Sequence, residues 1–100
     1  MLAIRKTETY ARWFDGLRDT HARARILARV ERLAAGNPGD VRSVGEGVSE
    51  MRIDYGPGYR VYCVQRGAAI VILLCAGDKR TQAQDIRRAQ AMAREMAERQ

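Results

Sequence analysis

The chain has few of the residues on which common catalytic sites depend. Its 100 residues include two cysteines and one histidine, His21. A single histidine leaves no Ser/His/Asp or Cys/His set and no cluster that could bind a metal ion. Paired carboxylates and a glycine-rich nucleotide loop are also missing. Cys63 and Cys75 each lie among apolar neighbours, so we expect two reduced core thiols and neither a disulfide nor a metal site.

Long apolar segments are missing as well. The longest run, residues 68–76, is far too short to span a membrane. The first residues carry charge too early for a signal peptide. There is no repeat of fixed period and no low-complexity tract, and 46% of the residues are hydrophobic. We therefore expect one soluble, cytoplasmic domain over residues 1–100, without membrane contact.

Arginine is the residue that the chain has in excess. The net charge is +6, and arginine supplies 16 of the 18 basic side chains. The planar guanidinium suits bidentate contact with phosphate or carboxylate groups. A small basic domain therefore indicates nucleic acid or an acidic protein as a partner, although surfaces rich in salt bridges also use arginine.

Hydrophobic periodicity predicts an α+β domain with the element order β-α-α-β-β-β-β-α. Helices are expected after Thr7, after Asp19 and, through a capping box of Thr81 and Gln84, after Thr81. Strands are expected at residues 2–5, 48–55, 59–66 and 69–76, and residues 41–44 form either a short strand or an extended connection. These elements indicate an N-terminal helical hairpin packed on a largely antiparallel sheet of four to five strands, followed by a C-terminal helix. The apolar run of the last strand predicts an interior position in the sheet.

The register of the hairpin around Gly56-Pro57-Gly58 decides which side chains share a face. If Tyr55 opposes Tyr59, one face is apolar and the other holds Arg52, Asp54, Arg60 and Tyr62. A slip by one residue would mix charge with core on both faces, so we prefer this register. It places Arg60 opposite Asp54 and Arg52 opposite Tyr62. The face is then either a surface with a cross-strand ion pair or a basic site that holds a nucleic-acid backbone, with Tyr62 or Tyr59 stacked on a base.

Lys79 and Arg80 follow the last strand directly. The end of a buried strand is a rigid place for a charged group, and the start of the next helix adds N–H donors and partial positive charge. These features favour an anion site, and they are equally compatible with a capped turn that carries two solvated cations.

Several motifs together resemble the RelE/ParE superfamily of type II toxins, in particular its HigB-like, phage-derived (Gp49-like) addiction module killer proteins. The similarity covers nearly the whole chain. It is carried by residues 51–62 (MRIDYGPGYRVY), residues 73–79 (LLCAGDK), Thr81-Gln82, Asp85-Ile86, Trp13-Phe14 and Leu17.

This resemblance implies a toxin that is neutralised by an antitoxin, usually a small helix-turn-helix protein. RelE-like members cut mRNA in the ribosomal A site with arginine and lysine residues of the sheet, without metal, cofactor or histidine. Arg60 matches the arginine of the family's Gly-Tyr-Arg motif, Lys79-Arg80 matches its basic pair, and Arg52 lies where members carry basic residues. The chain departs from RelE in the segment after the basic pair, where Gln84-Asp85-Ile86 replaces a tyrosine.

The resemblance favours a ribosome-dependent mRNA endonuclease that inhibits translation. Arg60 would stabilise the phosphate and the transition state, Lys79 would act as acid/base or phosphate contact, and Arg52 and Arg80 would support them. Arg23 and Arg29, on the polar face of the second helix, would contact ribosomal RNA or an acidic antitoxin segment. The alternatives are a ParE-like inhibitor of DNA gyrase that cleaves nothing, and a degenerate toxin that acts only as a binding partner.

Overall fold

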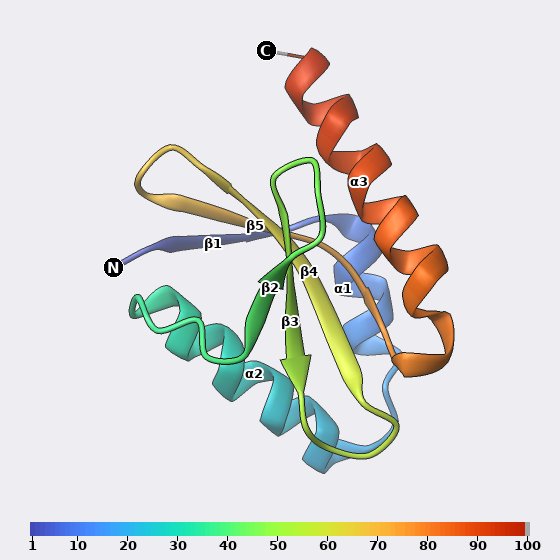
Figure 1. The fold of residues 1–100 in the computed structure, drawn as a ribbon. Helices are drawn as coiled ribbons and strands as arrows, with labels where there is room; N and C mark the ends of the chain where they lie inside the picture. Colours follow the sequence, from blue (N-terminus) through green and yellow to red (C-terminus); the bar gives the residue numbers. More distant parts are fainter. Residues whose placement is uncertain (100) are drawn as a thin grey trace.

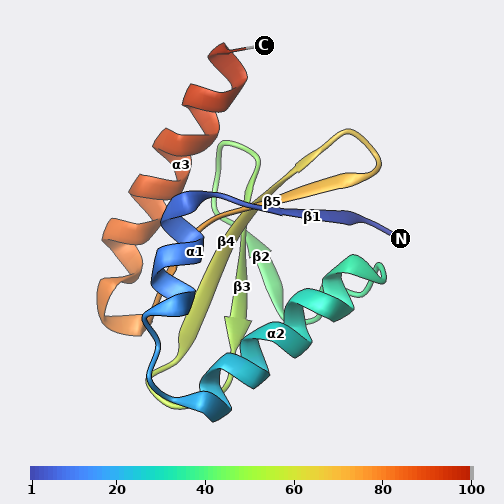
Figure 2. The ribbon, with the colours of Figure 1, turned by 180° about the vertical axis from the view of Figure 1, so that it is seen from behind.

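The computed structural model describes residues 1–99 and shows one five-stranded sheet with helices on both faces (Figures 1 and 2). The strand order is β1-β5-β4-β3-β2. Only β1 and β5 are parallel, and the other pairs are antiparallel. The strands are β1 (Ala3–Lys6), β2 (Val41–Ser43), β3 (Val48–Ile53), β4 (Tyr59–Arg66) and β5 (Ile70–Gly77). The predicted α+β class and element order are confirmed.

Two consecutive helices cover one face of the sheet. α1 (Glu8–Asp15) begins at Thr7, whose side chain accepts a hydrogen bond from the Tyr10 N–H. α2 (Thr20–Ala34) begins at Asp19, whose carboxylate accepts from the N–H groups of His21 and Ala22. Both predicted caps are confirmed. From the loop that joins them the two helices diverge across the sheet (Figure 2). No helix within residues 1–99 is long and apolar enough to cross a membrane.

The sheet separates two apolar clusters. The cluster under α1 and α2 includes Ile26, Met51, Val61 and Leu73. The cluster under α3 (Gln82–Glu98), on the opposite face, includes Val48, Tyr62, Leu74 and Ala89. β5 contributes to both clusters and has a strand on each side, as its unbroken apolar run predicts.

The two cysteines lie on opposite sides of the sheet. Cys63 belongs to the cluster under α1 and α2, and Cys75 to the cluster under α3. Both are buried free thiols, as predicted. Burial raises the pKa of each thiol to about 11, so both stay protonated and unreactive at neutral pH.

The β3–β4 hairpin differs from the predicted register by two residues. Ile53 opposes Tyr59 and Arg52 opposes Arg60, so the predicted Arg60–Asp54 and Arg52–Tyr62 pairs are wrong. The connection is five residues long, because Gly56 and Gly58 both adopt positive φ and widen the turn. A shift by two residues keeps every side chain on its predicted face.

The entry into α3 also differs from the prediction. Thr81 makes no capping-box hydrogen bond, and a 3₁₀ turn over Lys79–Thr81 precedes the helix. Asp78 begins this turn by accepting from the Arg80 N–H at 2.8 Å. The Thr81 hydroxyl instead donates to Oδ2 of the buried Asp85, at 2.5 Å. The predicted capping box is wrong because Asp78, three residues earlier, supplies the cap.

Candidate nucleic-acid site

Four cations around the hairpin are candidate site residues from the sequence, namely Arg52, Arg60, Lys79 and Arg80. Three of them line a single hollow in the structure. Arg52 from β3, Arg60 from β4 and Lys79 from the 3₁₀ turn surround a space of about 420 Å³. The glycine-rich loop 56–58, Asp40 and Asp54 also line the hollow. We call this space the cationic hollow.

The arginine pair in the cationic hollow is not fully neutralised by the protein. Arg52 and Arg60 are direct cross-strand neighbours, an arrangement that like charges normally disfavour. Both Nε atoms are buried, and within residues 1–99 neither finds a hydrogen-bond partner. A buried donor without an acceptor costs stability, and two neighbouring guanidinium groups repel each other, so an anion bound at this pair would relieve the repulsion.

Lys79 is held at the hollow by the glycine loop. Its backbone N–H donates to the Pro57 carbonyl at 3.4 Å. Gly58 has φ of +78°, and a Cβ at this position would lie 3.5 Å from the Lys79 Cβ. The loop therefore packs closely against the 3₁₀ turn, and this contact brings the end of β5 to the β3–β4 hairpin.

A buried carboxylate organises the same face of the sheet. Glu50 of β3 is fully buried next to the arginine pair. It accepts hydrogen bonds from Arg42 Nε at 2.8 Å, the Tyr62 hydroxyl at 2.9 Å and Gln82 Nε2 at 2.9 Å. Arg52 Nε lies 3.5 Å from Glu50 Oε1. The carboxylate thus joins β2, β3, β4 and α3 on the same face of the sheet as the arginine pair.

The hydrogen bonds around Glu50 determine its charge state. Burial alone would raise the pKa of the carboxyl group, but the donors Arg42, Gln82 and Tyr62 outweigh it and lower the pKa. Burial and the hydrogen bond to Glu50 raise the pKa of the Tyr62 hydroxyl. Glu50 is therefore ionised and Tyr62 protonated at neutral pH, and this is the combination that the hydrogen bond between them requires.

We expect Tyr62→Phe to lower the free energy of unfolding by about 1–2 kcal/mol, because the buried Glu50 carboxylate loses one donor. Urea unfolding monitored by circular dichroism measures the change. Tyr59→Phe is the matched control, since no hydrogen bond of the Tyr59 hydroxyl is present within residues 1–99. Equal urea midpoints for the two variants would contradict this role of the Tyr62 hydroxyl.

The remaining residues singled out around the hairpin lie elsewhere. Arg80 is highly exposed and pairs with Asp78 at 3.2 Å. Tyr62 is fully buried under α3, so the expectation that its ring stacks on a base is wrong. Tyr59 is half-buried on the opposite face of the sheet. Its ring packs edge-on against the Trp13 ring, with 5.9 Å between the two ring centres. The two tyrosines therefore do not form one stacking platform.

The two arginines expected to bind RNA on α2 are both engaged with the protein. The Arg23 guanidinium lies 5.3 Å from the centre of the Phe14 ring. Arg29 donates to the backbone carbonyls of Pro38, Asp40 and Arg52. Arg29 thereby connects α2 to the start of β2 and the end of β3, which is a structural role.

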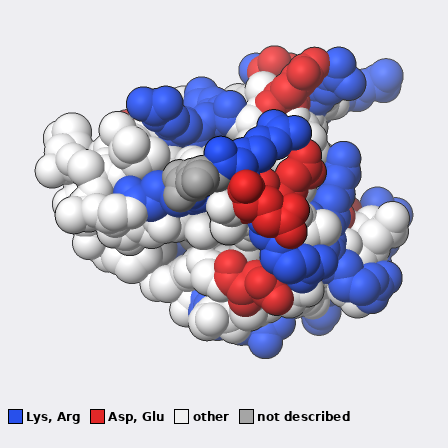
Figure 3. Space-filling view, turned by 90° about the horizontal axis from the view of Figure 1, so that it is seen from above, with Lys and Arg blue, Asp and Glu red and all other residues white. Residues whose placement is uncertain are grey.

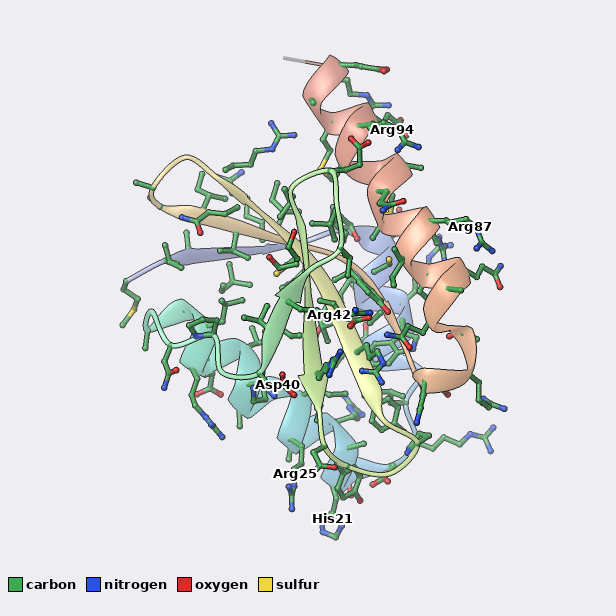
Figure 4. All side chains as sticks on the ribbon, viewed as in Figure 1. His21, Arg25, Asp40, Arg42, Arg87 and Arg94 are labelled. Atoms are coloured by element: carbon green, nitrogen blue, oxygen red, sulfur yellow. The ribbon has the colours of Figure 1, made fainter. Side chains whose placement is uncertain are left out.

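Sequence reasoning missed Glu50, Arg42 and Gln82. One signal was present, because Glu50 and Arg52 are two residues apart and therefore share a strand face. Arg42 and Gln82 reach the same face only through strand pairing and helix placement, which no local pattern reveals. Figure 4 shows Arg42 on the front of the sheet beside α3.

The chemistry available in the cationic hollow is anion binding. No group of three or more His, Cys, Asp or Glu side chains within residues 1–99 is arranged to hold a metal ion. Arg52, Arg60 and Lys79 supply positive charge and N–H donors, while Glu50 forms an ion pair with Arg52. Such a set suits a phosphate group with its charge spread over several oxygens.

Comparison with known proteins places the chain in a family. Residues 12–98 match the family described as Phage derived protein Gp49-like (DUF891). An uncharacterized protein of Haemophilus influenzae is 46% identical over 95 residues, which cover 95% of this chain and 96% of the relative. The chain therefore belongs to the Gp49-like family, a family of RelE-like toxins.

Proposed function

We propose that the protein is the toxin of a type II toxin–antitoxin system and a HigB-like, ribosome-dependent mRNA endonuclease. The observation that carries this proposal is the cross-strand pair of Arg52 and Arg60, whose buried Nε atoms make no hydrogen bond within residues 1–99, in a hollow shared with Lys79. A phosphodiester in the hollow would offset the repulsion between the two guanidinium groups. Membership of a family of RelE-like toxins supports the same activity.

Cleavage of RNA at its own 2′-hydroxyl fits this set of side chains. The 2′-hydroxyl gives up its proton to water and its oxygen attacks the adjacent phosphorus. The bond from phosphorus to the 5′-oxygen breaks, which leaves a 2′,3′-cyclic phosphate on one fragment and a 5′-hydroxyl on the other. Arg60 and Arg52 stabilise the negative charge that builds up on the phosphoryl oxygens. Lys79 contacts the phosphate or donates the proton that the leaving 5′-oxygen needs. Arg80 lies outside the hollow, and we assign it contact with the flanking backbone.

The partners in this proposal are mRNA on the ribosome and a cognate antitoxin, which the resemblance implies is a small helix-turn-helix protein. The surface supports an anionic partner in both cases, because the net charge is +6.

The test is to induce the wild-type protein, Arg60→Ala and Lys79→Ala in cells, to map RNA 5′ ends and to monitor DNA damage. We expect mRNA cuts in phase with codons for the wild type and a loss of cutting of at least about 100-fold in both variants. Arg87→Ala, on the outer side of α3, is the control and should cut like the wild type (Figure 4).

Two results would contradict the proposal. A DNA-damage response with intact mRNA would indicate a ParE-like inhibitor of gyrase. Absence of toxicity from a folded wild-type protein would indicate a degenerate toxin that only binds its partner.

A further inference from the structure

A second hollow continues from the cationic hollow towards α2. It has a volume of about 270 Å³ and is lined on one side by Arg25, Ala28, Arg29 and Arg32 of α2. We call it the helix groove. Asp40, Ile53 and Asp54 line both the helix groove and the cationic hollow, so the two spaces meet at these three residues. In Figure 4, Arg42, Asp40 and Arg25 follow one another down the front of the molecule.

The arginines of the helix groove differ in whether their guanidinium groups are already bound by other groups of the protein. Arg29 is held by three backbone carbonyls and supports the wall of the groove. Arg25 and Arg32 are exposed, and within residues 1–99 neither forms an ion pair. They lie seven residues apart on α2, which corresponds to roughly 10 Å along the helix.

Arg25 is oriented before any ligand binds. Its guanidinium lies 5.2 Å from the centre of the Tyr55 ring. The Tyr55 hydroxyl in turn donates to Asp19 Oδ2 at 3.1 Å, which fixes the ring against the start of α2. A cation held over an aromatic ring loses less side-chain entropy when it binds a phosphate.

We propose that the helix groove holds the phosphates of the nucleotides next to the one in the cationic hollow, through Arg25 and Arg32. Single-stranded RNA then follows one path from β3 and β4 around the start of β2 to α2. This inference rests on the proposed function, because it extends the substrate site of the same reaction.

The carboxylates of Asp40 and Asp54 determine which part of each nucleotide of the bound RNA lies where along this path. A phosphate is repelled from the junction that both carboxylates line, and it is attracted to the cations on either side. The junction therefore takes a sugar or a base, whose hydroxyl or amino groups can donate to a carboxylate. Six cations and two carboxylates line the combined path, so attraction of the backbone dominates.

The test compares binding of a trimer and an octamer of 2′-O-methyl uridine, which cannot be cleaved, by fluorescence anisotropy. The wild type should bind the octamer about 10-fold more tightly or better, because only the octamer reaches the helix groove. Arg25→Gln/Arg32→Gln should remove this gain and leave trimer affinity unchanged. The slope of log affinity against log salt for the octamer should fall in magnitude by about 1.4, the value for two lost phosphate contacts on a single strand.

Arg87→Gln/Arg94→Gln is the matched control, since it removes the same charge from α3 (Figure 4). Charges of both signs alternate over α3, as Figure 3 shows from the end where the C-terminus lies. The control should bind both oligomers like the wild type. Urea midpoints of both double variants verify that they remain folded.

Three outcomes would overturn the inference. Equal losses in the two double variants would show a general charge effect. Equal binding of trimer and octamer by the wild type would show that the groove is not used. An RNA duplex that competes as well as the octamer, and does so through Arg25 and Arg32, would indicate a ribosomal helix as the ligand. In all three, mRNA cleavage stays intact, whereas failure of the proposed function removes mRNA cleavage.

Discussion

Replacing Glu50 with leucine should lower the free energy of unfolding by about 2–4 kcal/mol. The fully buried Tyr62 hydroxyl and the half-buried Gln82 amide would lose their acceptor. Arg42 and Arg52 would lose their counter-charge, but both side chains are more than 40% exposed and can turn towards water. The apolar contacts of leucine offset part of the lost stability. The expected destabilisation is therefore smaller than for the loss of one partner of a wholly buried ion pair.

Glu50→Gln separates the charge from the shape of the side chain. The pKa of Glu50 is lower in the folded protein than in the unfolded chain. Its ionised form therefore stabilises the fold above the unfolded pKa of about 4.3, and this contribution is lost as the pH falls through the folded pKa. The difference in stability between wild type and Glu50→Gln should be constant above about pH 5 and shrink towards zero in acid.

Urea unfolding of both proteins between about pH 7 and about pH 3 measures this difference. Glu31→Gln is the matched control, because Glu31 is exposed on α2 and forms no ion pair within residues 1–99. A stability difference for Glu50→Gln that stays the same at every pH would refute the role of an ionised carboxylate.

Gly77→Ala should destabilise the protein by about 1–3 kcal/mol through overpacking. A Cβ at residue 77 would lie 1.9 Å from Asp85 Oδ2 and 2.7 Å from Thr81 Oγ1. Asp85 has a short side chain and is 7% exposed, so it has little room to move aside. The first turn of α3 would have to shift away from β5, and Lys79 would shift with it.

A double-mutant cycle tests the cause. Asp85→Ala removes the carboxylate that makes the closest collision with the new methyl group, so Gly77→Ala should lower the free energy of unfolding less in the Asp85→Ala background than in the wild type. An equal loss of unfolding free energy in both backgrounds would mean that contact with Asp85 does not cause the destabilisation by Gly77→Ala. Binding of the octamer should weaken in Gly77→Ala and recover partly in the double variant, because Lys79 lines the cationic hollow.

Features that depend on a few neighbouring residues could be predicted from the sequence. The apolar run of β5 indicated an interior strand, and Thr7 and Asp19 indicated two helix starts. The alternation in β3 and β4 identified the face of Arg52 and Arg60 because side chains alternate with a period of two.

Features that depend on loop geometry or on distant elements could not be predicted. The offset between β3 and β4 was wrong by two residues because alternation cannot distinguish registers that differ by an even number. Tyr62 was expected at the surface, and α3, which begins 20 residues later, covers it. The role of Glu50 in joining neighbouring strands depends on the strand pairing, which places Arg42 and Tyr62 opposite it.

The parallel pairing of β1 with β5 has a consequence for co-translational folding of the protein. Strands β2 to β5 follow one another as hairpins and can pair as they emerge from the exit tunnel. β1 must wait for Ile70–Leu73, and Thr7 waits for the Leu74 carbonyl, 67 residues further along. Such long-range contacts slow folding. A nascent chain of this protein therefore cannot complete its sheet until Leu73 has left the exit tunnel.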